Sequence, residues 1–390
     1  MNENSKNSNI SNFNELLHNL MSEGDEEVRS YTVEALGTIK NDMAVDDLIS
    51  SLSDKNEGVR IKVAEILGDI NEKSAALDIA KKGLHDEKDL VRWMSAWALG
   101  KLRADETSSE LVSCLDDENP WVRGTCAWAL GRIGDNESIQ KIEDLTHDKN
   151  SWVRIQAVRA LGMISDERST LDLLNALTDK NKIVRSSAAW SLGLVSDDRA
   201  VGELKNIIKT DDSKEVKENS IWALGAIGEK KAAEFLMDIV LHNDEFDMRK
   251  EASRSLSEIL DNSIPNKFKE KLDSGLIKTK IRILEFLGFF GGDESIHYLK
   301  SYLHDSNPEL RFTAIKSLGY LGSKTAVKPL KNIVKTDDNF SIRETALEAF
   351  VRLNDEMSEI ALKKLKDELE DEKLKGLIDD ILEKNTSPRF

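Results

Sequence analysis

The amino-acid sequence predicts an all-α protein that folds as an α-solenoid of about eleven stacked two-helix repeats. Three observations support this prediction. A similar string of residues recurs along most of the chain, and apolar residues recur at helical spacing within it. Glycine and proline, which interrupt helices, account for only 21 and 5 of the 390 residues. A chain of this length would otherwise be expected to divide into two or three domains with separate cores.

The recurring string is typified by WVRGTCAWALGRIGD at residues 121–135, and each copy carries one basic residue at the same place. Successive basic residues are 31 or 32 positions apart, which defines a single array of repeats from residue 13 to residue 355. We number the basic residue of each repeat as position zero. These residues are Arg29, Arg60, Arg92, Arg123, Arg154, Arg185, Lys217, Arg249, Lys280, Arg311 and Arg343.

Capping residues delimit a helix around each basic residue, the second helix of the repeat. Position −4 is asparagine in six repeats, and its side chain accepts a hydrogen bond from the free amides at a helix start. Pro120 and Pro308 follow at position −3, where a missing N–H costs nothing. The spacing therefore predicts about four helical turns. Position +11 holds residues suited to a left-handed helix end, namely Asn71, Gly134, Gly228, Gly291, Gly322 and Asn354.

The segments between these helices predict the first helix of each hairpin. Residues 138–145, 169–177 and 200–208, for example, have apolar side chains three and four positions apart. At the ends of the chain, residues 1–12 are rich in asparagine and serine and are expected to form a disordered tail. Residues 356–385 are strongly charged and are expected to form capping helices, because the last repeat of a solenoid would otherwise expose an apolar face.

An aspartate at position −6 and the sequence A-x-A-L-G before position +9 complete a pattern that resembles HEAT repeats of the short, phycobilisome-lyase-like type. The resemblance implies a right-handed superhelix whose second helices line the concave side. The family includes scaffolds, lyase subunits and hydroxylases, so the resemblance does not select a function. The aspartates are Asp54, Asp86, Asp117, Asp148, Asp179, Asp211, Asp305 and Asp337.

Repeats eight and nine depart from this pattern. Asn243 and Ser274 replace the aspartate, Ser257 replaces the glycine at position +8, and Pro265 follows between the repeats. We therefore expect a local irregularity near residues 243–275. Elsewhere the aspartate and arginine recur in successive repeats, whereas an active site is normally made once. We predict that these pairs hold the turns and tie each repeat to the next, and that the glycine at +8 allows close helix packing.

The seven tryptophans are predicted to share one face of the second helices. At 100° per residue, positions −1, +3, +4, +7 and +11 form the core face, and positions −2, +1, +5 and +9 lie opposite. A contiguous patch of large aromatic side chains indicates a binding site. The tryptophans are Trp93, Trp97, Trp121, Trp128, Trp152, Trp190 and Trp222. The residues predicted to extend the patch are Leu90, Met94, Ile155, Met163, Ile183 and Leu194.

Charged side chains on the same face indicate the chemistry of a partner. Lys101, Arg132 and Arg159 lie among the tryptophans, and acidic positions flank them in repeats one, two, seven and eight. This arrangement favours a protein or peptide segment, such as an amphipathic helix with acidic residues. Four repeat steps cover roughly 40 Å, the length of about 25 helical residues. Two alternatives stay open: the indoles close the inner groove on themselves, or they hold a small flat ligand.

Composition and missing motifs exclude several other functions. The chain has 72 acidic and 55 basic residues, a net charge of −17, which argues against nucleic acid and a DNA-repair role. No apolar run predicts a membrane span or a secretion signal, and two cysteines favour the cytoplasm. HEAT-like deoxyhypusine hydroxylases use His-Glu dipeptides as iron ligands, and no histidine here precedes a glutamate. We find no catalytic, cofactor-binding or metal-binding constellation.

The sequence therefore predicts a non-enzymatic protein-interaction scaffold that is a monomer outside its complex. The resemblance leaves two alternatives. One is a lyase or chaperone-type subunit that handles a tetrapyrrole-like chromophore, because flat aromatic rings and cations suit a ring with propionates. The other is a deoxyhypusine-hydroxylase-like relative that lacks the iron ligands.

Overall fold

The computed structural model describes residues 17–22, 25–39, 42–228, 230–260, 263–353 and 358–386, which contain helices and no strand. The predicted tail, residues 1–12, lies outside the described residues, as does Asn354. The chain divides into two compact units, residues 1–223 and 224–390. The even spacing of the repeats does not predict this division, and the two units are described separately below.

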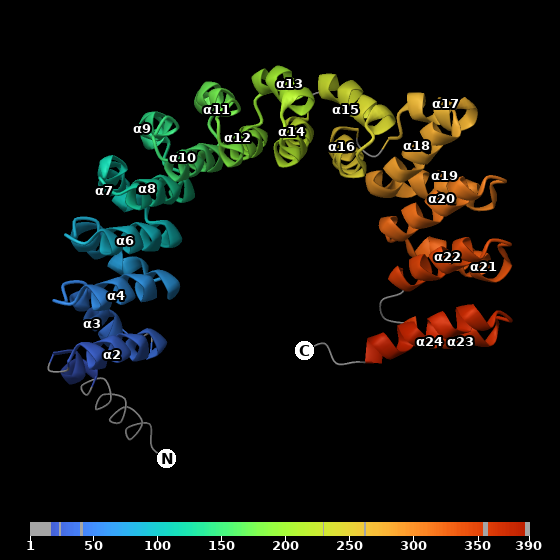
Figure 1. Ribbon diagram of the computed structural model, residues 1–390. Coiled ribbons are helices and arrows are strands. Elements are labelled where there is room, and N and C mark those ends of the chain that lie inside the picture. Colours follow the sequence, from blue (N-terminus) through green and yellow to red (C-terminus); the bar gives the residue numbers. More distant parts are fainter. Residues whose placement is uncertain are drawn as a thin grey trace, which may run out of the picture. The chain divides into compact units, whose positions relative to one another are not determined.

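Unit 1 is a series of helix hairpins, as the repeat spacing predicts. Its second helices lie side by side on the inner side of a curved stack, and its first helices form the outer layer (Figure 1). The first helices are α3 (Asp42–Ser51), α5 (Ala76–Asp78, continued by a π-helix, Ile79–Gly83), α7 (Ser108–Ser113), α9 (Ile139–Leu145), α11 (Thr170–Ala176) and α13 (Val201–Thr210). The second helices are α2 (Glu26–Ile39), α4 (Glu57–Asp69), α6 (Asp89–Leu102), α8 (Pro120–Ile133), α10 (Ser151–Ile164), α12 (Lys182–Val195) and the first part of α14 (Lys214–Ile227).

The predicted helix starts are confirmed. The Asn119 side chain accepts the amide N–H of Trp121 at 2.8 Å, and Asn150 accepts that of Trp152 at the same distance. Pro120 and Pro308 occupy the first turns of α8 and α20 (Pro308–Leu321). Asn56, Asn181, Asn307 and Asn339 cap their helices in the same way.

The predicted helix ends are partly confirmed. Gly134 and Gly322 adopt the left-handed conformation, with φ of 82° and 72°. Gly291 does not, because its φ of 89° is combined with a ψ of −172°. Arg103, Ser165 and Ser196 at position +11 also have positive φ, which the sequence does not predict. Their amides bond to the carbonyl four residues earlier, so the hairpin imposes the left-handed turn even where no glycine is present.

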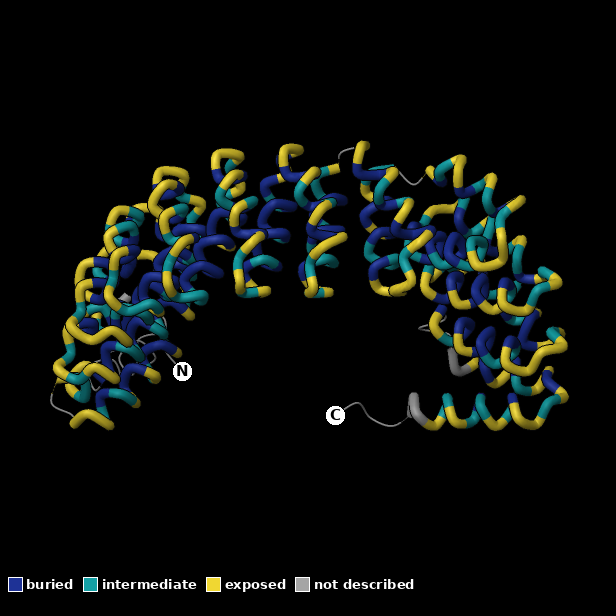
Figure 2. The backbone as a smooth tube through the Cα atoms, turned by 45° about the horizontal axis from the view of Figure 1, so that its top comes forward, coloured by how far each residue is buried: buried dark blue, intermediate teal, exposed yellow. Residues whose placement is uncertain are grey.

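Glycine at position +8 allows neighbouring second helices to approach closely, as predicted. A Cβ atom added at Gly100 would lie 2.9 Å from Cα of Ala129 in the next repeat. Around these contacts, Leu99, Leu130 and Leu161 at position +7 are fully buried. Figure 2 shows the buried residues running through the interior of each helical stack. Each hairpin therefore obtains its core from its neighbours.

The aspartate and arginine pairs form a regular series in unit 1, which we call the Asp/Arg ladder. Arg60 donates through Nε and Nη2 to the carboxylate of Asp86 in the next repeat, at 2.7 and 2.8 Å. Its Nη1 donates to the backbone carbonyl of Asp54 in its own repeat. The predicted structural role of these residues is thus confirmed. The ladder consists of Arg29–Asp54, Arg60–Asp86, Arg92–Asp117, Arg123–Asp148, Arg154–Asp179 and Arg185–Asp211.

The aspartates of the ladder also hold the turns between the helices. Asp86 accepts the amide N–H of Lys88, so one carboxylate binds both the turn and the preceding repeat. Burial tends to raise the pKa of Asp86, but the hydrogen bonds from Arg60 and the Lys88 amide hold that pKa below its ordinary value. The carboxylate is therefore ionised at neutral pH and paired with the guanidinium.

Unit 2 contains the same hairpins with an irregular start, near residues 243–275 as predicted. Arg249 pairs with Glu285, and Arg282 pairs with Asp244, in place of the ladder contacts. The regular pair returns as Arg311–Asp337. The helices are α15 (Lys230–His242), α16 (Phe246–Ile259), α17 (Asn266–Ser274), α18 (Ile277–Phe290), α19 (Gly292–Ser301), α20, α21 (Val327–Thr336), α22 (Phe340–Arg352), α23 (Ser358–Asp367) and α24 (Glu372–Thr386). The last two lie in the segment predicted to cap the solenoid.

Candidate functional site

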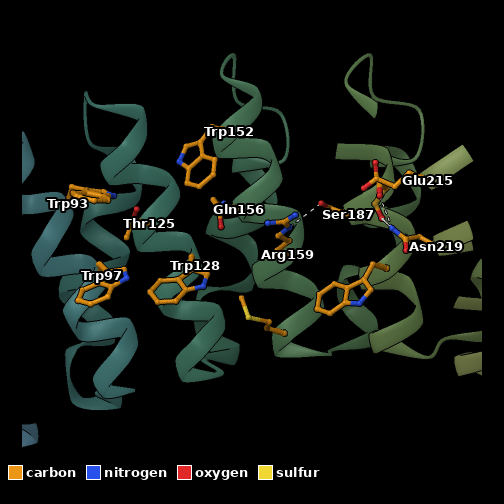
Figure 3. Close-up of a pocket in the computed structure, with 13 residues that line it drawn as sticks. Trp93, Trp97, Thr125, Trp128, Trp152, Gln156, Arg159, Ser187, Glu215 and Asn219 are labelled. Atoms are coloured by element: carbon orange, nitrogen blue, oxygen red, sulfur yellow. Dashed lines mark hydrogen bonds between the residues drawn. The ribbon is translucent and has the colours of Figure 1, made fainter. Parts of the chain in front are cut away.

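Five tryptophans from four second helices line one groove in unit 1, which we call the Trp groove (Figure 3). They are Trp93 and Trp97 on α6, Trp128 on α8, Trp152 on α10 and Trp190 on α12. The groove has a volume of about 650 Å³. Its other lining residues are Thr125, Gln156, Arg159, Met163, Ser186, Ser187, Glu215 and Asn219.

None of the seven tryptophans is buried in the core. Trp121 is 54% exposed, and the other six are half-buried. Trp121 lies 5.0 Å from Trp152, and Trp222 stacks on Trp190 at 6.3 Å between ring centroids. Trp121 and Trp222 therefore adjoin the Trp groove through other indoles and are not among its lining residues.

The half-burial of three of the four indoles at position +5, those of Trp97, Trp128 and Trp222, has a common cause. A Cβ atom added at Gly100 would lie 2.5 Å from Cζ3 of Trp128, so that edge of the indole rests on the glycine of the preceding repeat. Trp97 is seated on Gly68 and Trp222 on Gly193 in the same way. The glycines therefore do two things: they bring the helices together and they seat the indole rings.

The three predicted cations have different surroundings. Lys101 pairs with Asp69 at 2.7 Å and lies over the ring of Trp97, 4.8 Å from its centroid. The Arg132 guanidinium lies 5.6 Å from the Trp128 ring centroid. Arg159 is exposed and, of the three, it alone lines the Trp groove. The structure thus places Arg159 in the Trp groove, whereas Lys101 forms an ion pair with Asp69 of the same chain.

The residues predicted to extend the patch differ in their exposure to solvent. Met163 lines the Trp groove, and Leu90 and Ile183 are exposed. Met94 and Leu194 are half-buried. The predicted exposure of Ile155 was wrong, because this residue is only 7% exposed. Its position, +1, lies at the margin of the outward face, where α10 meets a neighbouring helix.

Sequence reasoning missed the polar floor of the Trp groove, which is formed by buried and half-buried side chains at positions +1 and +2. Arg159 Nε donates to Ser187 Oγ at 3.2 Å, and Asn219 Nδ2 donates to Ser186 Oγ at 2.7 Å. Position +2 lies at 200°, at the margin of the outward face opposite to position +1. A polar residue occurs there in four consecutive repeats, which was the available signal: Thr125, Gln156, Ser187 and Asn219.

Other potential sites are less developed. In the described part of the chain, no group of three or more His, Cys, Asp or Glu side chains is arranged to hold a metal ion. Cys114 and Cys126 are free and buried. Burial raises the pKa of the Cys126 thiol well above its ordinary value, and contact with Cys114 adds to this, so the thiol is protonated and unreactive. None of the described helices has the length and apolar character of a membrane span.

A family model described as HEAT repeats matches residues 13–91, 77–162, 108–180, 170–257 and 265–351. A comparison with curated proteins finds no match.

Solved structures with a similar fold include Kap121p, with a TM-score of 0.53 and 13% identity over 90% of this chain and 45% of that one. Kap95p from a complex with RanGDP has a TM-score of 0.52 and 13% identity over 90% of this chain and 61% of that one. The complex of CpcE and CpcF of phycocyanin lyase from Nostoc sp. PCC7120 has a TM-score of 0.38 and 20% identity, covering 63% and 94% of the two chains. At 13% identity the likeness to Kap121p and Kap95p concerns the fold alone, an all-α solenoid.

Proposed function

We propose that this chain, which belongs to the HEAT-repeat family, is a non-enzymatic scaffold that binds a segment of a partner protein in the Trp groove. The observation that carries the proposal is the convergence of five half-buried indoles on one groove of about 650 Å³. Indole rings offer a large contact area and lose little conformational entropy on binding, which is why tryptophan dominates binding hot spots.

The order of residues at position +5 supports a partner with a central negative charge. In five consecutive repeats this position is Trp97, Trp128, Arg159, Trp190 and Trp222. Among the described residues, no carboxylate lies within ion-pair distance of Arg159, so its guanidinium is available to a ligand. A partner segment with apolar side chains on both sides of an Asp or Glu would complement this row.

The outer cations have a secondary part in this proposal. Arg132 lies over Trp128 and can supply a second contact to an acidic partner. Lys101 would have to exchange Asp69 for a carboxylate of the partner, so we expect it to contribute least. Because both cysteines are free, we place this function in a reducing compartment such as the cytoplasm.

The experiment compares partners recovered by affinity purification from the native source, identified by mass spectrometry. The bait variant is Trp93→Ala/Trp190→Ala, which removes two walls of the groove and spares the glycine-seated Trp97 and Trp128. We expect the variant to keep its helical circular dichroism and to lose the partner. Tyr320→Ala is the control, because this 44% exposed aromatic belongs to unit 2. Equal recovery with the double variant would contradict the proposal.

A further inference from the structure

We infer that the partner segment lies in the Trp groove as an extended chain, hydrogen-bonded through its main chain to Gln156 and Thr125 and paired through one Asp or Glu with Arg159. This inference rests on the proposed function and specifies the conformation and charge of the partner. It replaces the amphipathic helix that the sequence favours.

The inference starts from two buried polar side chains on the floor of the groove. Gln156 is 5% exposed and Thr125 is 6% exposed, and both line the Trp groove. Neither side chain has a hydrogen-bond partner among the described residues, whereas the neighbouring Ser187 and Ser186 are bonded to Arg159 and Asn219. The polar atoms of both side chains are not among the atoms that are shielded from solvent without a partner, so they face the open groove. A carboxamide and a hydroxyl held at one site and free of internal hydrogen bonds are available to a ligand that supplies the partners.

The hydrogen-bonding capacity of the two side chains distinguishes an extended chain from a helix. A carboxamide offers two donors and an acceptor, and a hydroxyl can donate and accept. A helix uses its main-chain N–H and C=O groups internally, so its flank presents side chains alone. A polyproline-II-like segment has no internal hydrogen bonds, and its peptide groups are free to bond with Gln156 and Thr125.

The repeat spacing gives the expected sequence of such a segment. Neighbouring second helices lie about 10 Å apart. A polyproline-II-like chain advances about 3.1 Å per residue with three residues per turn, so every third side chain would meet the next repeat. A helix advances about 1.5 Å per residue and would need seven residues for the same step.

The position of Arg159 places the charge within this sequence. Its guanidinium lies beside Gln156 in the middle of the groove, with Trp128 towards one end (Figure 3). Trp190 lies in the repeat on the other side. An Asp or Glu that pairs with Arg159 should therefore have an apolar residue three positions before it and another three positions after it.

The first test selects a phage-displayed library of random 16-residue peptides on the full chain, which are long enough to hold apolar residues seven positions to either side of a central residue. The expected result is enrichment of an Asp or Glu with apolar residues three positions to either side. Enrichment at seven-residue spacing would overturn the extended conformation and leave the proposed function standing. If the wild type enriches no sequence that Trp93→Ala/Trp190→Ala fails to enrich, both the proposed function and this inference are overturned.

The second test examines the contacts, using the most enriched peptide made synthetically. Gln156→Leu keeps the side-chain volume but removes the hydrogen bonds, and we expect at least a tenfold weaker Kd by calorimetry. Asn175→Leu on the outer helix α11 is the control for the substitution itself. Arg159→Glu should enrich Lys or Arg in place of the acidic residue when the library is selected again. Unchanged affinity with Gln156→Leu, or an unchanged acidic preference with Arg159→Glu, would overturn the corresponding contact.

Discussion

Units 1 and 2 both place aromatic side chains on their second helices, with different outcomes. In unit 1 the indoles frame the Trp groove above a polar floor. In unit 2, Phe289 stacks on Tyr320 with 5.3 Å between ring centroids and contacts Phe246 at 5.8 Å. Lys250 and Arg254 lie over Phe289, at 5.8 and 6.0 Å from its centroid. Aromatic residues on second helices thus form a groove where they frame a space, and a packed cluster where they contact one another and the chain's own cations.

The ion pairs of the two units differ in a related way. In unit 1 each guanidinium of the Asp/Arg ladder is held by the aspartate of the next repeat. At the start of unit 2 the aspartate that would bind Arg249 is replaced by Ser274, and Arg249 pairs instead with Glu285, which is 23% exposed. The loss of one aspartate at position −6 therefore changes the partner of the arginine and does not leave the arginine without an ion pair.

The largest expected effect on stability comes from breaking one pair of the Asp/Arg ladder. Arg154→Ala leaves the Asp179 side chain, which is only 12% exposed, without its partner, and this should lower the free energy of unfolding by about 3–5 kcal/mol. Arg249→Ala in unit 2 should cost less, because Glu285 is better solvated. Urea denaturation, together with amide hydrogen exchange in α10 and α16, measures both losses. Equal losses would show that the regular ladder is no stronger than the rerouted pair.

A smaller effect is expected where the helices approach at glycine. A Cβ atom at Gly100 would lie 2.5 Å from Trp128 and 2.9 Å from the backbone of Ala129, so Gly100→Ala should cost about 3 kcal/mol. At Gly319 in unit 2 the nearest atom would be the Ala349 Cβ at 3.1 Å, and the cost should be smaller. Gly202→Ala on α13 meets no neighbour within 4 Å and should stabilise its helix. Thermal denaturation of the three variants measures the order of their stabilities. A Gly100→Ala variant as stable as Gly319→Ala would contradict the expected order.

The smallest effect concerns two carboxylates with similarly low pKa values. A hydrogen bond from the Arg199 side chain lowers the pKa of Asp197 from 3.8 to about 2. Burial opposes this shift, whereas hydrogen bonds from the Arg199 amide and the Thr170 hydroxyl add to it. Because the folded pKa is depressed, this stabilisation is present above pH 3.8 and is lost as the pH falls towards 2. Asp197→Asn should therefore lower the free energy of unfolding by about 2 kcal/mol at pH 7 and by less than about 0.5 kcal/mol at pH 2, where half of the carboxyl groups are protonated.

Glu368 in unit 2 is the matched comparison. Hydrogen bonds from Lys335 and Lys331 lower the pKa of Glu368 to about 2, although this carboxylate is on the surface. Salt screens exposed pairs far more than buried ones, so 1 M NaCl should remove the effect of Glu368→Gln and leave most of the effect of Asp197→Asn. The same salt dependence for both variants would show that Asp197 is not protected by its burial.

Particular residues show how far prediction from the sequence extended. The asparagines at −4 and the basic residues at zero predicted the helix starts and the repeat, because capping and apolar periodicity are local properties. The angular analysis placed the tryptophans off the core. It missed the seat of Trp128 on Gly100 and the internal pairing of Lys101 with Asp69, because each joins residues 28 or more positions apart.

The sequence by itself determined the hairpin, its boundaries and the number of its copies, since these depend on residues within one repeat. Only the tertiary structure decided which aspartate each arginine binds, which five indoles frame the Trp groove, and that Gln156 and Thr125 lie beneath them with no hydrogen-bond partner in the described part of the chain. The physical reason is that the groove is formed jointly by side chains from several neighbouring repeats. Its width and the contacts of its floor depend on how neighbouring helices are spaced and rotated, which no single repeat specifies.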